Sequence, residues 1–128
     1  MWVAHLLTTT AVVEAITGIS LIVVPNLVTE LLFGEPLTGA GLALARVAGV
    51  ALFALGVAAW RGRQDLSRST SFAAMIAYNI PVAIYLTYLG IGGHLAGVLL
   101  WPAAALHLAL GLLLVRAWLA HQPQPSAN

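Results

Sequence analysis

Four side chains that can exchange protons or hold a polar ligand each stand alone in a long apolar stretch: Glu14, Arg46, Asn79 and His107. A carboxyl and an imidazole are groups that proteins use for general acid–base chemistry, and a guanidinium stabilises a developing oxyanion. These residue types predict proton transfer on a bound molecule. In that prediction Glu14 or His107 moves the proton, Arg46 tunes the acid or stabilises an oxyanion, and Asn79 orients the substrate.

The composition places these residues in a membrane protein. Of 128 residues, 61% are hydrophobic and 7% are charged, whereas about a quarter of the residues in a soluble domain are charged. The net charge of +1 lacks the basic footprint of a nucleic-acid-binding protein, so nucleic acid is excluded as a partner. The absence of Cys excludes disulfides, a thiol nucleophile and a Cys-based zinc site.

Four stretches are long and apolar enough to position these residues inside a membrane. They cover roughly residues 3–24, 39–60, 71–89 and 95–117, each close to the length of about 20 residues that a spanning helix needs. We predict an all-α fold, an integral membrane bundle of four transmembrane helices forming one domain over residues 1–120. The segment 26–38 is predicted to contain a short interfacial helix, and the tail 121–128 to be disordered.

Positive charge gathers at one end of these spans, on Arg61, Arg63, Arg68 and Arg116. Cytoplasmic loops carry the excess of Lys and Arg, so both termini are predicted to be cytoplasmic, in a multi-pass protein of the bacterial inner membrane. Three tryptophans fall at the same end, where indoles favour the headgroup region: Trp2, Trp60 and Trp118.

The helical rise places the four polar residues at one depth, about 10 to 18 Å from the outer boundary of the hydrocarbon. We expect Glu14 and Arg46 to pair, because burying either charge alone costs more than burying both. Arg46, Gly49 and Gly56 are predicted to share one face of the second helix. Gly93 and Gly97 form a GxxxG pair at the start of the last predicted span, where small residues let helices approach closely.

Prolines inside two predicted helices indicate a cavity. Pro81 and Pro102 each remove a backbone hydrogen bond, and a freed carbonyl is tolerated in lipid only beside protein or a wet cavity. The predicted substrate-binding residues, besides Asn79, are Thr17, Tyr78, Tyr85, Trp101 and Phe53. No two histidines on different helices share mid-membrane depth, so neither a metal site nor a haem or other cofactor is predicted.

Residues 25–34 and 44–56 carry a family resemblance. A helix-ending Pro25 and the pair Phe33-Gly34 precede a helix with Arg46-x-x-Gly49 and a later Gly56. This pattern resembles the DoxX-like group of small four-helix bacterial membrane proteins. The resemblance implies a link to quinone-coupled sulfur oxidation or to membrane-associated redox complexes, and it adds support for Arg46 and Gly49 alone.

A second resemblance rests on the single acid in the first helix, within Glu14-Ala15-Ile16-Thr17. It is similar to that of the small multidrug resistance exporters, in which such an acid exchanges protons for cationic drugs. Arg46 in the second helix and the one-sided distribution of arginines depart from that pattern.

Several functions stay open at this point. The leading prediction is a bundle that binds a lipophilic small molecule, such as a terpenoid, a sterol-like compound or a quinone. Its possible reactions are acid–base isomerisation, epoxide opening or cyclisation. The alternatives are a non-catalytic subunit or anchor of a membrane complex, with a homo-oligomer or another protein as partner, a proton-coupled exporter, and polar residues that only fix helix register.

Overall fold

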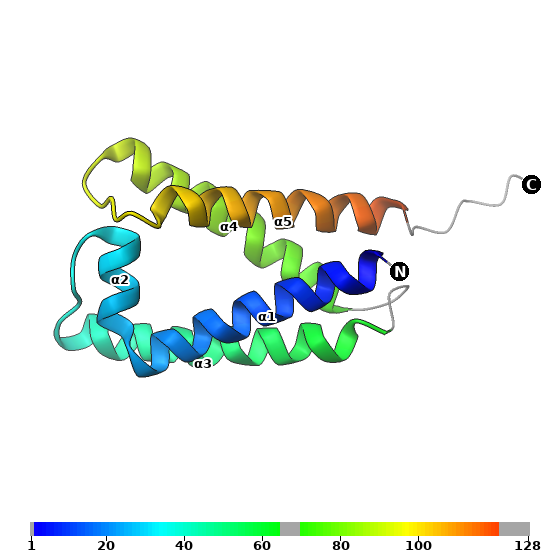
Figure 1. Cartoon of the computed structure of the whole chain (residues 1–128), viewed down its shortest axis with the longest axis horizontal. Helices are drawn as coiled ribbons and strands as arrows, with labels where there is room; N and C mark the ends of the chain where they lie inside the picture. Colours follow the sequence, from blue (N-terminus) through cyan, green and yellow to red (C-terminus); the bar gives the residue numbers. More distant parts are fainter. Residues whose placement is uncertain (1, 65–69, 121–128) are drawn as a thin grey trace, which may run out of the picture.

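The computed structural model describes residues 2–64 and 70–120, which fold into five helices and no strand (Figure 1). They are α1 (Trp2–Val23), α2 (Pro25–Phe33), α3 (Gly39–Gly62), α4 (Thr70–Gly92) and α5 (Leu100–Ala120). All of them except α2 are long and apolar enough to cross a membrane, which agrees with the four predicted spans. The predicted tail 121–128 and Arg68 lie outside the described residues.

The four long helices form two close pairs, α1 with α3 and α4 with α5. Glycine permits the approach of α1 and α3. A Cβ added at Gly18 would lie 2.6 Å from the carbonyl oxygen of Gly49, and one at Gly56 would lie 2.8 Å from that of Ala11. Both neighbours are backbone atoms of a packed helix, which cannot move aside cheaply. The first pair is therefore held at a spacing that larger residues at these positions would prevent.

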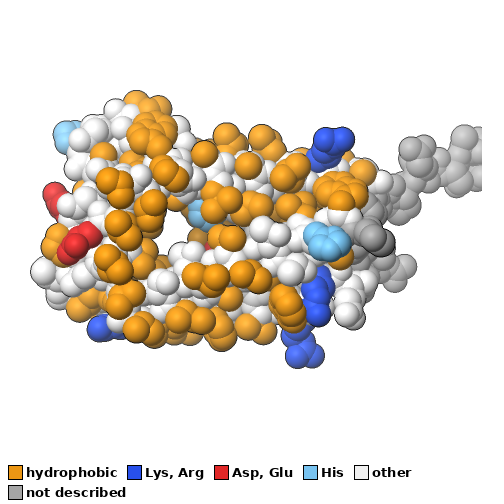
Figure 2. All heavy atoms as spheres, in the orientation of Figure 1, with side chains coloured by type: hydrophobic (Ala, Val, Ile, Leu, Met, Phe, Trp, Pro, Cys, Tyr) orange, Lys and Arg blue, Asp and Glu red, His pale blue; other side chains and the backbone are white. Residues whose placement is uncertain are grey.

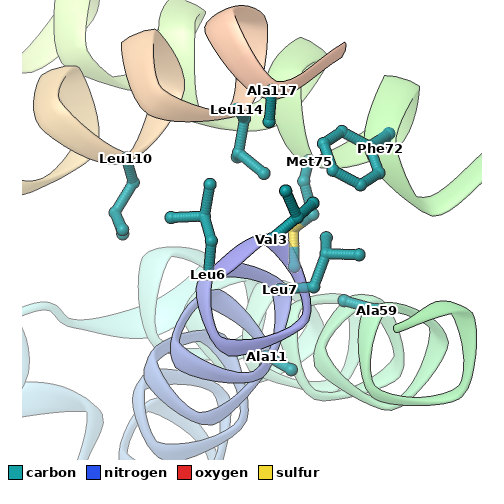
Figure 3. Close-up of a cluster of buried hydrophobic side chains, with 10 residues drawn as sticks. All are labelled: Val3, Leu6, Leu7, Ala11, Ala59, Phe72, Met75, Leu110, Leu114 and Ala117. Atoms are coloured by element: carbon teal, nitrogen blue, oxygen red, sulfur yellow. The ribbon is translucent and has the colours of Figure 1, made fainter. Parts of the chain in front are cut away.

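The two pairs meet in a packed core at the end of the bundle where the N-terminus lies. Figure 3 shows its side chains pointing toward one another from four helices. They are Val3, Leu6, Leu7 and Ala11 of α1, Ala59 of α3, Phe72 and Met75 of α4, and Leu110, Leu114 and Ala117 of α5. The same end holds Arg61, Arg63 and Arg116 and the tryptophans Trp2, Trp60 and Trp118, and the Arg63 guanidinium lies 4.0 Å from the centre of the Trp60 ring. We call this region the packed end.

At the opposite end the short helix α2 crosses the bundle (Figure 1). α1 stops at Val23, and Pro25 starts α2 at a first-turn position where its missing N–H costs no hydrogen bond. Gly34 ends α2 in the left-handed conformation, with φ 80°, and its N–H donates to the carbonyl of Glu30. The predicted short helix after Pro25 is thus present, and its apolar side chains face the bundle.

The segment before α5 holds α2 in place through the backbone. The N–H of Gly97 donates to the carbonyl of Leu32 at 3.0 Å, and the N–H of Leu99 donates to that of Leu31 at 2.8 Å. These carbonyls belong to the last turn of α2, which has no partners within its own helix. We call these two bonds the α2 bridge, and we call the end of the bundle that contains it the open end.

The structure of residues 93–102 corrects three predictions about the last span. α5 begins at Leu100 rather than Leu95, because residues 94–99 run along α2 instead of continuing a helix. Gly93, with φ +69°, and Gly97 therefore form no helical GxxxG pair. Pro102 falls in the first turn of α5, where it interrupts no helical hydrogen bond, so the predicted loss of a backbone hydrogen bond there was wrong. Pro81 does lie inside α4.

Candidate functional site

A cavity of about 550 Å³ separates the two helix pairs at the open end. Its wall takes side chains from α1, α2, α4 and α5 and a single residue, Leu52, from α3. Figure 2 shows the molecule hollowed between the pairs on the face that lies along the helices. The mouth of the cavity is therefore on the side of the bundle rather than at its end.

Most of the wall is aliphatic, and its polar groups are few. Among the described residues that line the cavity, side-chain hydrogen-bonding groups come from Thr17 and Ser20 of α1, Tyr78 of α4 and His107 of α5. No Arg, Lys, Asp or Glu belongs to that lining. A wall of this kind suits a largely apolar ligand that carries a small polar group.

Glu14 lies directly behind this wall. Its side chain is fully buried, and neither carboxylate oxygen makes a hydrogen bond to any described residue. The Tyr78 hydroxyl, on the facing helix, is near enough to the carboxylate for the two groups to interact electrostatically. Burying an ionised carboxylate without a partner is costly. Among the described residues, Glu14 is therefore a buried polar side chain without a hydrogen-bond partner.

Asn79, a second buried polar residue, has a hydrogen-bond partner at both ends of its amide. Its side-chain Nδ2 donates to the carbonyl of Met75 at 2.9 Å, and its Oδ1 lies 2.9 Å from Nδ1 of His107. The His107 ring also packs against Tyr78, with ring centroids 5.6 Å apart and ring planes at 81°. We call Glu14, Tyr78, Asn79 and His107 the polar cluster.

The spacing of residues along each helix explains how three helices position the polar cluster. Thr10, Glu14 and Gly18 recur every four residues on α1 and are all buried, because this spacing places them on one face of the helix. Thr17, three residues after Glu14, turns toward the cavity. Tyr78 and Asn79 are consecutive, so one α4 position faces the cavity and the next faces α5.

Arg46 does not join the cluster, contrary to the predicted pair with Glu14. Its side chain is exposed, and no ion pair links it to the carboxylate of Glu14. The buried stripe of α3 runs through Ala45, Gly49 and Gly56. Arg46 follows Ala45 by one residue and is rotated by about 100° from that stripe. The prediction failed because Gly49 was grouped with the residue three positions earlier instead of the one four earlier.

Three predicted substrate-binding aromatics also lie outside the cavity. Phe53, Tyr85 and Trp101 do not line it, and their side chains are 41%, 59% and 52% exposed. The Trp101 ring lies over Gly90 of α4, where an added Cβ would meet it at 2.8 Å. Their placement on the wall was wrong because aromatic character alone does not say which face of a helix a residue occupies.

Part of the cavity wall comes from α2, the helix that the sequence predicts only as a short interfacial helix. Leu27, Leu31 and Phe33 line the cavity at the open end. The signal was present in the apolar spacing of this segment. What the sequence does not reveal is the α2 bridge, because backbone hydrogen bonds to residues 94–99 leave no mark on side-chain type.

The polar cluster combines an acid, a hydroxyl and an imidazole beside one apolar cavity. This combination can hold a polar group by hydrogen bonds and can carry a proton to or from it. Among the described residues, no three His, Asp or Glu side chains are grouped in a way that could hold a metal ion. The chemistry available to the cluster on its own is therefore hydrogen bonding and proton transfer.

Comparisons of the chain with protein-family models, with curated proteins and with solved structures find no match. The resemblance of residues 25–34 and 44–56 to the DoxX-like group stays a prediction.

Proposed function

We propose that this chain is an integral protein of the bacterial inner membrane, with both termini cytoplasmic, that takes a lipophilic small molecule from the bilayer. The four long apolar helices support insertion. The distribution of charge supports the orientation, since Arg61, Arg63 and Arg116 belong to the packed end and Glu30 and Glu35 to the open end. Among the described arginines, Arg46 is the exception, in the half of α3 nearer the open end. In this orientation the packed end is cytoplasmic.

The observation that carries the proposal is the lateral cavity with a polar cluster at its inner wall. Its volume, about 550 Å³, is within the range of small-molecule sites. In a bilayer, an opening on the side of the bundle faces lipid tails, so a molecule dissolved in the membrane enters without crossing water. Its apolar body would fill the aliphatic part, and its polar group would meet Tyr78 and His107. Terpenoid, sterol-like and quinone compounds fit this description.

A second candidate function is acid–base chemistry on the bound molecule, which the juxtaposition of Glu14, Tyr78 and His107 favours. His107 would accept a proton, while Glu14 would supply one through the Tyr78 hydroxyl. Such a pair serves isomerisation, epoxide opening or cyclisation, none of which needs a cofactor. Turnover of the bound compound that survives Glu14→Gln and His107→Gln individually would contradict this chemistry.

Native mass spectrometry of the full chain, released from membranes in a mild detergent, tests binding. We expect the wild-type protein to retain a lipophilic adduct. Ala103 lines the cavity four residues before His107, so Ala103→Phe should place a ring beside the polar group of the site and abolish the adduct. Ala105 is exposed on the same helix, so Ala105→Phe adds the same side chain outside the cavity and should retain the adduct.

Two outcomes would overturn the proposal. An adduct of unchanged occupancy in Ala103→Phe would show that the molecule binds elsewhere. A wild-type protein that carries no adduct, but holds another protein at fixed stoichiometry, would favour the non-catalytic anchor of a membrane complex.

A further inference from the structure

The hydrogen bonds of Asn79 fix the orientation of its amide. Nδ2 donates to the carbonyl of Met75 at 2.9 Å, and a carbonyl can only accept. The reversed amide would place two oxygens against each other, so the orientation follows from the bonding partner. Oδ1 is therefore the atom that Asn79 presents to His107, at 2.9 Å from Nδ1.

This orientation selects one tautomer of His107. Because Oδ1 of Asn79 accepts, Nδ1 of His107 must carry the hydrogen. In a neutral imidazole the other nitrogen, Nε2, then has a lone pair and acts as an acceptor. No hydrogen bond to Nε2 is formed within the described part of the chain, and the ring lines the cavity. The cavity thus presents an acceptor on α5 that a ligand can fill.

The opposite group on the wall is the Tyr78 hydroxyl, which can donate to a ligand. Its ring is in edge contact with His107, and both residues line the same cavity. A ligand hydroxyl satisfies both, since it donates to Nε2 and accepts from Tyr78. A ketone or quinone oxygen only accepts, and it would leave Nε2 without a donor.

Charged headgroups fit this wall less well. The described lining holds no Arg or Lys, and Arg46 faces outward, so nothing neutralises a carboxylate or phosphate that is placed near Glu14. An ammonium group has Glu14 as its only possible counter-ion at the site, and Glu14 is fully buried behind the wall. An uncharged hydroxyl needs neither.

We infer that the cavity selects a lipophilic alcohol or phenol, with Asn79 acting as a positioning residue that holds His107 in the accepting tautomer. This inference rests on the proposed binding function. It adds the class of ligand and assigns a role to a residue that does not itself touch the ligand.

Competition in native mass spectrometry tests the class of ligand. The full chain in mild detergent, stripped of its endogenous adduct, is given equal concentrations of dodecanoic acid, dodecylamine and chain-perdeuterated 1-dodecanol, so that the three adducts are resolved by mass. We expect the alcohol adduct to dominate in the wild-type protein and to disappear in Ala103→Phe. A dominant acid or amine adduct would overturn the inference and leave the binding function intact. Failure of all three probes, together with no endogenous adduct, would overturn the binding function as well.

The tautomer is tested separately by nitrogen NMR of the wild-type protein labelled with ¹⁵N-histidine. His107→Gln assigns the signal by difference. We expect a protonated Nδ1 and a bare Nε2 for His107. The reverse tautomer would overturn the inference whatever the protein binds.

Asn79→Leu removes the acceptor at similar volume. We expect His107 to lose its tautomer preference and the alcohol to bind about tenfold more weakly, which corresponds to the loss of about one hydrogen bond. Unchanged alcohol binding together with an unchanged tautomer would contradict the positioning role. The wild-type spectrum keeps this role testable if the variant does not fold.

Discussion

The two ends of the bundle are built from similar residues but packed differently. At the packed end, side chains from α1, α3, α4 and α5 fill the space between the helix pairs, and Leu7, Met75 and Leu114 are fully buried. At the open end the same pairs enclose a cavity, and α2 closes the gap by crossing it. The difference shows that the open end is shaped by backbone placement and not by a shortage of large apolar side chains.

The boundary between the two ends coincides with the polar cluster. On α1 the core residues Val3 to Ala11 precede Glu14, and the cavity residues from Val13 onward surround or follow it. On α5 the order is reversed along the chain, because the cavity residue His107 comes before the core residues Leu110 and Leu114. The polar cluster therefore lies between the close-packed core and the cavity.

The largest expected effect comes from deleting a side chain at the packed end. Leu7→Ala should lower the free energy of unfolding by about 2–5 kcal/mol, because it leaves a void in a close-packed core. Leu106→Ala, at the cavity wall, should cost less than about 1 kcal/mol, since Leu106 is 43% exposed and already borders empty space. Equilibrium unfolding in mixed micelles measures both values. Equal losses would mean that the two ends are packed alike.

A smaller effect is expected from adding one methyl group where the helices touch. Gly18→Ala should destabilise the protein by about 1–3 kcal/mol, because its new Cβ meets backbone atoms of α3. Gly92→Ala is the matched control, since its Cβ would find no atom nearer than Cδ2 of His94 at 4.0 Å. The same unfolding measurement applies. If the Gly18 variant is as stable as the control, α1 and α3 are not held together by this contact.

The smallest effect is expected at Arg46. Arg46→Gln should change the free energy of unfolding by less than about 1 kcal/mol, because the side chain is exposed and away from the polar cluster. It should also leave the retained adduct unchanged in native mass spectrometry. Loss of the adduct would reinstate the pairing with Glu14 that the structure does not contain.

Much of the fold could be predicted from the sequence because it depends on length and hydropathy. The four long helices, the break at Pro25 and the short helix after it follow from apolar runs and from proline chemistry. The start of α5 could not be predicted in this way. Residues 95–99 are apolar enough to be helical, and they are drawn out by the α2 bridge instead.

The sequence predicts those site residues that only need to be polar within an apolar helix. It does not predict which face of the helix a residue occupies. The structure buries Glu14 and joins Asn79 to His107, since polar residues within apolar helices face the bundle interior. Arg46 departs from this rule because its long side chain can remain on the outside of the bundle. The buried Ala45 and the exposed Arg46 are adjacent on α3. Because α3 is apolar on all sides, its sequence has no periodic pattern that shows which of the two faces the interior.

The α2 bridge has a consequence for how this protein can change over evolutionary time. It attaches α2 through main-chain atoms, so the side chains of Leu27, Val28 and Leu31 line the cavity and take no part in these hydrogen bonds. Substitutions there can reshape the cavity and leave the scaffold standing. Gly97 has no such freedom, because any side chain would collide with the carbonyl oxygen of Leu31. Descendants of this chain can therefore diversify in what they accommodate while inheriting the same frame.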